Sequence, residues 1–135
     1  MSPESPLTAG PQHQAERPVF DYPGTLARLG GSKSLFAELS RYYIEDSVTV
    51  LAQLREALLS RDPHDVELAV HRLKGLIANF GADRATLTVS EAEYSARAGQ
   101  IEEVALAYSR LEACVLELRG TLSLLLRRAE EESRR

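Results

Sequence analysis

The hydrophobic positions of the chain follow a helical pattern. From about residue 33 to residue 60 apolar side chains recur at helical spacing, and from about residue 101 they recur at alternating steps of three and four, which is typical of amphipathic helices. The first stripe comprises Leu35, Phe36, Leu39, Tyr43, Val50, Leu51, Leu54 and Leu58, and the second Val104, Tyr108, Leu111, Val115, Leu118, Leu122 and Leu125. No segment sustains a period of two, so we expect no strands.

Start and stop signals predict three further helices, over about residues 21–29, 62–80 and 83–98. Gly30-Gly31 permits a stop after the first, and Ser32 can cap the long helix that follows. Asp62-Pro63 is a strong start, because proline at the first helical position loses no hydrogen bond. Gly81 can end that helix in a left-handed conformation, and Asp83 is predicted to cap the next one.

These elements predict an all-α fold, an antiparallel up-and-down four-helix bundle with a short additional N-terminal helix. Residues 1–18 hold four of the six prolines and lack apolar periodicity (Pro3, Pro6, Pro11, Pro18). We therefore expect a flexible tail over residues 1–18 and one domain over residues 19–135.

The helix predicted over residues 62–80 carries the residues best suited to chemistry. Its apolar residues cluster on one side, and His71 lies almost opposite the centre of that side. Lys74 and Gly75 follow His71 by about one turn, and Ala78 and Ala82 continue the same exposed stripe. Glycine inside a helix costs about 1 kcal/mol relative to alanine, so Gly75 indicates a surface that a partner approaches closely.

His71-Arg72-Leu73-Lys74-Gly75 followed by Ala78-Asn79-Phe80-Gly81-Ala82 resembles the signature of histidine-containing phosphotransfer (Hpt) domains of two-component signalling. The resemblance extends to Phe20-Asp21 and the segment 26–31 before this motif, and to Glu93, Ala96-Arg97 and Gly99 after it. It covers roughly residues 19–126.

The resemblance implies a phosphorelay protein in which His71 accepts a phosphoryl group from the aspartate of one receiver domain and passes it to another. The expected partners are the receivers of a hybrid sensor histidine kinase and of a response regulator. Lys74 would stabilise the charge of the transferred group, and neutral imidazole offers a lone pair for in-line attack. The implied docking face consists of Arg72, Gly75, Ala78, Asn79 and Ala82.

The same resemblance implies a phosphocarrier rather than an enzyme, without a cofactor or metal of its own, the magnesium ion coming from the partner receiver. The sequence contains no glycine-rich phosphate loop for ATP. Four alternatives stay open. The domain could bind receivers as an adaptor or inhibitor without carrying phosphate, or it could be a purely structural helical domain that binds no receiver. His64, Glu67 and His71 could hold a metal ion, and Lys74 could simply pair with Glu67 or Asn79.

Composition and charge narrow the setting. A chain of 135 residues with 44% hydrophobic residues is expected to form one packed domain, and we expect a monomer. A net charge of -4 argues against nucleic acid, and the apolar runs are too short for a membrane span. No basic or apolar leader is visible, and the single Cys114 agrees with a reducing compartment, so we expect a cytoplasmic location.

Overall fold

The computed structural model describes residues 18–134, and every regular element in that range is helical, as the sequence predicts. The elements are α2 (Tyr22–Arg28), α3 (Lys33–Ser60), α4 (Pro63–Ile77), the 3-10 turn η1 (Ala78–Phe80), α5 (Asp83–Arg97) and α6 (Ile101–Arg134). Apart from Pro18, the tail predicted over residues 1–18 lies outside the described range. None of the helices described is long and apolar enough to cross a membrane.

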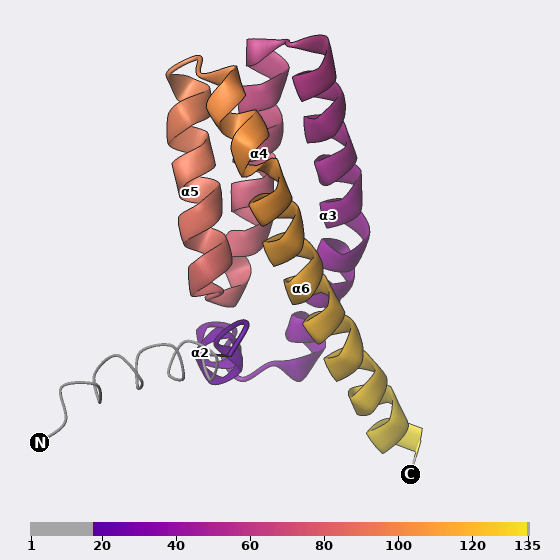
Figure 1. The fold of residues 1–135 in the computed structure, drawn as a ribbon. Coiled ribbons are helices and arrows are strands. Elements are labelled where there is room, and N and C mark those ends of the chain that lie inside the picture. Colours follow the sequence, from indigo (N-terminus) through magenta and orange to yellow (C-terminus); the bar gives the residue numbers. More distant parts are fainter. Residues whose placement is uncertain (1–17, 135) are drawn as a thin grey trace, which may run out of the picture.

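The four long helices lie side by side around a shared apolar core (Figure 1). α4 contacts α3 and α5, and α6 contacts the same two helices. The short α2 lies at one end, where it meets α3 and η1, and α6 continues past that end (Figure 1). The largest fully buried side chains include Tyr43, Phe80, Leu54, Leu73, Leu111 and Leu118.

The helix ends follow most of the predicted signals. Ser32 Oγ accepts a hydrogen bond from the Leu35 amide, and Asp62 Oδ1 accepts one from the Asp65 amide, each at 3.1 Å. Each cap satisfies an amide that the first turn of a helix leaves free. Gly81 has φ +57° and follows η1, so it ends the α4–η1 segment in the left-handed conformation predicted for it.

The prediction that Asp83 caps the helix expected over about residues 83–98 is wrong. Ala82 occupies the cap position without a side-chain hydrogen bond, and Asp83 is the first helical residue. A carboxylate in the first turn still interacts favourably with the positive end of the helix dipole. The acidic residue therefore marks the start of α5 correctly but acts one position later than a cap.

Side chains that bond to main-chain carbonyls join α3 to α6. The Tyr43 hydroxyl donates to the Val115 carbonyl at 3.0 Å, and Arg119 Nε donates to the Ile44 carbonyl at 2.8 Å. Ser47, which interrupts the apolar stripe of α3, is fully buried, and its Oγ has no hydrogen-bond partner in the described part of the chain. These hydrogen bonds fix α3 against α6. The Ser47 hydroxyl, by contrast, is buried without a hydrogen bond from the described residues to replace those it makes with water in the unfolded chain.

Candidate functional site

His71 stands on the outer face of α4. The apolar residues predicted to face the core are all buried, namely Val66, Ala69, Val70, Leu73, Leu76, Ile77 and Phe80. Asp62 and Pro63 mark where the helix begins. Because the apolar side of α4 is buried, the opposite side of the helix faces outward. The His71 side chain is 66% exposed, as the sequence predicts.

A buried carboxylate on the neighbouring helix holds the His71 ring. Glu93 projects from α5 with only 5% of its side chain exposed, and its Oε2 lies 2.8 Å from His71 Nδ1. Its Oε1 accepts a hydrogen bond from Lys74 Nζ at 2.8 Å. Arg97 Nη2, one turn along α5, lies 3.5 Å from Oε2. Three nitrogen-bearing side chains therefore contact this one carboxylate, and these contacts offset the cost of burying its charge.

These partners keep Glu93 ionised. The hydrogen bond from Lys74, followed by that from His71, lowers the pKa of Glu93 from 4.5 to about 2, and the charges of Arg97 and Lys74 add to this. Burial acts in the opposite direction and is outweighed. At neutral pH the carboxylate can therefore only accept hydrogen bonds.

The ionised carboxylate determines which nitrogen of His71 carries the proton. Since Glu93 can only accept, the 2.8 Å contact requires that Nδ1 donates its N–H. In the neutral ring Nε2 is then unprotonated and keeps its lone pair. The site thus presents an exposed, oriented nucleophilic nitrogen, with the Lys74 ammonium one helical turn away.

Four of the five residues predicted to form the docking face are exposed, namely Arg72, Gly75, Ala78 and Asn79. A Cβ added at Gly75 would meet no atom within 4 Å, so nothing inside this chain requires glycine there. Ala82 is the exception, with 1% exposure. Its predicted place on the exposed stripe is wrong, because α4 ends at Ile77 and the chain turns inward through η1 and Gly81.

Two alternatives considered from the sequence find no support in the structure. Lys74 pairs with Glu93 rather than with Glu67 or Asn79. Within residues 18–134, no group of three or more His, Cys, Asp and Glu side chains is placed to hold a metal ion. His64, Glu67 and His71 therefore do not form such a group.

Reasoning from the sequence missed the role of Glu93, which entered only as part of the family resemblance. A physical signal was present, because Glu93 lies among the small and apolar residues of α5 that face the core, between Val89, Ala92 and Ala96. An acidic residue on a buried helix face needs a cationic or N–H partner. The exposed His71 and Lys74 on one side of α4 were the available donors.

Comparisons with known proteins agree with this geometry. The family model described as Hpt domain matches residues 38–127, a range that contains His71, Lys74 and Glu93. Among solved structures, the chain is similar to histidine-containing phosphotransfer protein B from Pseudomonas aeruginosa PAO1, with a TM-score of 0.75 and 22% sequence identity. The match covers 84% of this chain and 98% of that one, and it shows a common fold. A search among curated proteins found no match.

Proposed function

Because the chain belongs to the Hpt domain family and functions in histidine phosphotransfer within a phosphorelay, we propose that His71 is the residue that carries the phosphoryl group. The observation that carries this proposal is the hydrogen bond from His71 Nδ1 to the buried Glu93 carboxylate. It leaves Nε2 as the free nucleophile on an exposed ring.

The transfer step follows from this arrangement. Nε2 attacks the phosphorus of an aspartyl phosphate in line, the N–P bond forms, and the bond from phosphorus to the aspartyl oxygen breaks. The aspartate leaves as a carboxylate and takes the electron pair of that bond. Nδ1 keeps its proton, so the phosphorylated ring is an imidazolium, and the charge of Glu93 stabilises it as a carboxylate does behind a catalytic histidine. Loss of the phosphoryl group to a second aspartate reverses the sequence.

Lys74 and Glu93 have different roles in this proposal. Glu93 is a positioning residue, because it acts on the reacting nitrogen through the imidazole ring. Lys74 lies one turn from His71 with its side chain 43% exposed, so its ammonium can approach the phosphoryl oxygens as a point charge. Because Lys74 also binds Glu93, the two roles are coupled through one carboxylate.

We propose receiver domains as the partners, one delivering and one accepting the phosphoryl group, and we propose that the receiver supplies the magnesium ion. The docking face then comprises Arg72, Gly75, Ala78 and Asn79 around His71. We further propose that α3 to α6 form an antiparallel up-and-down four-helix bundle, which agrees with the contacts between consecutive helices and the short turns that join them.

A phosphotransfer assay tests the assignment of His71. A receiver domain from the same cell is phosphorylated on its aspartate with labelled acetyl phosphate and mixed with this chain. Wild type should gain label that is lost in acid and retained in alkali, as expected for a phosphoramidate. His71→Gln should gain none while keeping its helix content, because an exposed side chain contributes little to folding.

His64→Gln is the matched control, since His64 is also exposed on α4. It should gain label like the wild type. Label on His64 or His13 instead of His71 would show that the assignment is wrong. A chain that binds the phosphorylated receiver without gaining label would be an adaptor, an alternative that the family match does not favour.

A further inference from the structure

A groove of about 770 Å³ lies between α3 and α4. Because α4 contacts α3 on one side and α5 on the other, this groove lies across α4 from Glu93. Its lining includes Val48, Ala52 and Gln53 of α3 and Leu68, Ala69 and Arg72 of α4. The groove therefore borders the phosphoacceptor helix on the side that the Glu93 network leaves free.

The groove has accessible apolar residues. Val48 is 39% exposed and Leu68 is 40% exposed, and Ala52 and Ala69 also line the groove. A partner that inserted an apolar side chain beside Leu68 would remove Leu68 from water, which stabilises a complex in proportion to the apolar area covered.

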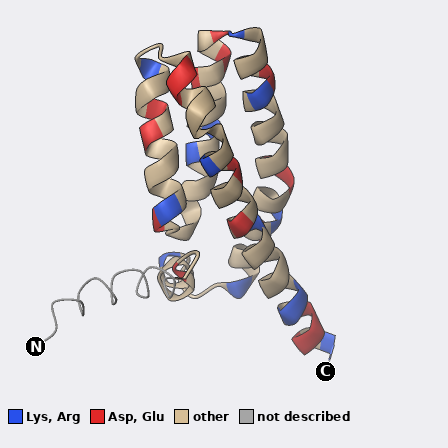
Figure 2. Cartoon of the chain, viewed as in Figure 1, with Lys and Arg blue, Asp and Glu red and all other residues tan. Residues whose placement is uncertain are grey.

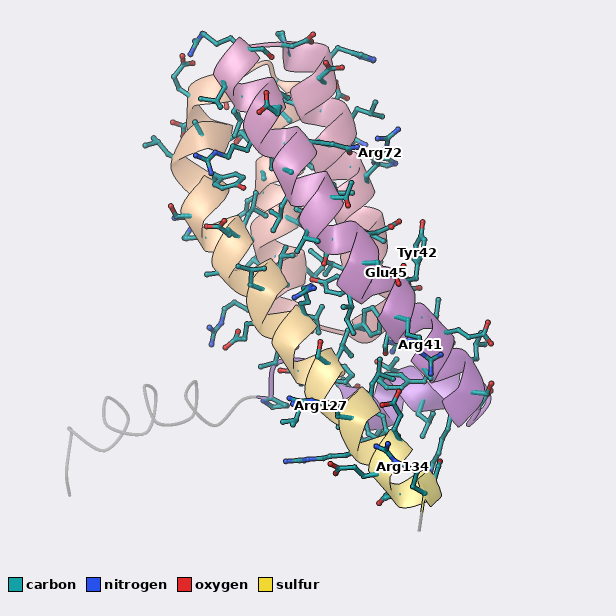
Figure 3. All side chains as sticks on the ribbon, turned by 90° about the vertical axis from the view of Figure 1, so that its right-hand side faces the viewer. Arg41, Tyr42, Glu45, Arg72, Arg127 and Arg134 are labelled. Atoms are coloured by element: carbon teal, nitrogen blue, oxygen red, sulfur yellow. The ribbon has the colours of Figure 1, made fainter. Side chains whose placement is uncertain are left out.

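Arg72 gives the groove a positive charge beside Gln53. It is exposed, and its Nη1 donates to Gln53 Oε1 at 3.3 Å, while no carboxylate within residues 18–134 pairs with it. Figure 3 shows the Arg72 side chain projecting outward beside α3. A guanidinium binds a carboxylate more strongly than it binds a neutral amide, so a partner carboxylate can replace Gln53.

The two acidic residues that line the groove lie on the side of Arg72 that faces the turn between α3 and α4. Asp65 is in the first turn of α4, and Glu56 is near the end of α3, so both lie toward the turn that joins these helices. A partner carboxylate is therefore favoured beside Arg72 and repelled nearer the turn. The charges therefore favour one orientation of a partner bound in the groove.

The groove is continuous with the phosphoacceptor surface. Leu68 lines both this groove and the hollow that contains His71 and Glu93, and Arg72 directly follows His71 in the chain. A protein that brings a phosphorylated aspartate to His71 therefore lies next to the groove and can contact Leu68 and Arg72.

We infer that this groove selects among receiver domains, by accepting an apolar side chain beside Leu68 and pairing an adjacent aspartate or glutamate of the receiver with Arg72. The inference rests on the proposed function. Its occupant is a receiver surface that presents an apolar residue next to a carboxylate, and Arg72 determines specificity without taking part in the chemical step.

The test separates binding from transfer. Dissociation constants for several receiver domains of the same cell are measured by calorimetry, and transfer rates are measured at saturating receiver. Arg72→Glu should weaken binding of the preferred receiver about tenfold, because it turns an attraction at the interface into a repulsion. The loss should be larger for the preferred receiver than for the others. Leu68→Gln should also weaken binding, and Arg110→Glu, an equal charge change at an exposed site on α6, should not.

Charge reversal on the receiver completes the test. Replacing one acidic residue of the preferred receiver with lysine should restore binding to Arg72→Glu. Equal binding by wild type and Arg72→Glu, an equal loss for every receiver without rescue, or a lower saturated rate with unchanged binding would overturn the inference. Self-association of the isolated chain that Arg72→Glu abolishes would assign the groove to a second copy and also overturn it.

The two proposals fail in different ways. The calorimetric measurement needs no phosphoryl group, so it remains informative even if His71 gains no label. If His71 is labelled and Arg72→Glu binds every receiver normally, only the inference about the groove fails.

Discussion

Replacing Glu93 with glutamine removes the negative charge that contacts His71 and leaves the volume of the side chain almost unchanged. The buried side chain keeps its length, and an amide oxygen can still accept a hydrogen bond from His71 or Lys74. The variant loses the negative charge that Lys74, His71 and Arg97 share. It therefore tests both the stability of the site and the proposed role of the carboxylate.

The structure gives the size and sign of the stability effect. The pKa of Glu93 is about 2 in the folded chain and 4.5 for an ordinary glutamate, which corresponds to about 3 kcal/mol at about 1.4 kcal/mol per pH unit. Since Lys74 and His71 are 43% and 66% exposed, solvent screening reduces this to about 1–2 kcal/mol. Because the folded-state pKa is lowered, this contribution is fully present above about pH 5 and is lost as the pH falls toward 2.

Urea unfolding of wild type and Glu93→Gln at pH 6 and pH 3 measures this contribution. The wild type should be more stable by about 1–2 kcal/mol at pH 6, and the difference should fall to less than half of that value at pH 3. Transfer to His71 in the variant should be about tenfold slower, since a charged hydrogen bond becomes a neutral one. An equal stability difference at both pH values would refute the electrostatic reasoning.

Three further substitutions have distinct expected outcomes. Gly75→Gln should fold at least as stably as wild type, because an added Cβ meets no atom within 4 Å, yet it should transfer on the order of a hundredfold more slowly by holding the receiver away; unchanged transfer would contradict close docking. Lys74→Ala should slow transfer about tenfold without changing the Kd of the receiver, and an equal rate would remove Lys74 from the mechanism. Ser47→Ala should raise the free energy of unfolding by about 1 kcal/mol in urea titrations, because it removes a buried hydroxyl without a partner; a loss of stability would show that the hydroxyl is bonded.

The helices were largely predictable because their signals are local. Ser32 and Asp62 cap the helices they precede, and Gly81 takes the left-handed conformation, since each acts on its own few residues. Ala82 was misplaced because a wheel of 100° per residue was continued past the end of α4. The helix becomes a 3-10 turn at Ala78, and the phase of the wheel no longer applies there.

The site was only half predictable for a related reason. His71 and Lys74 lie on one helix, so their spacing alone places them on one face. Their common partner Glu93 is 22 residues from His71 in the chain, and only the packing of α5 against α4 brings them together. Sequence spacing cannot report such a contact. The charges of the chain give little help either, because acidic and basic residues are interspersed along the helices (Figure 2).

The bond that holds the phosphoryl group tests the central claim most directly. The chain is labelled with nitrogen-15 histidine and phosphorylated by a receiver, and the coupling between phosphorus and nitrogen is measured by NMR. If Glu93 holds the Nδ1 proton of His71, phosphorus must couple to Nε2 of His71 and to no other histidine nitrogen. Coupling to Nδ1 of His71 would contradict the proposed tautomer, and phosphorus bound to His64, to His13 or to a carboxylate would contradict the assignment of His71.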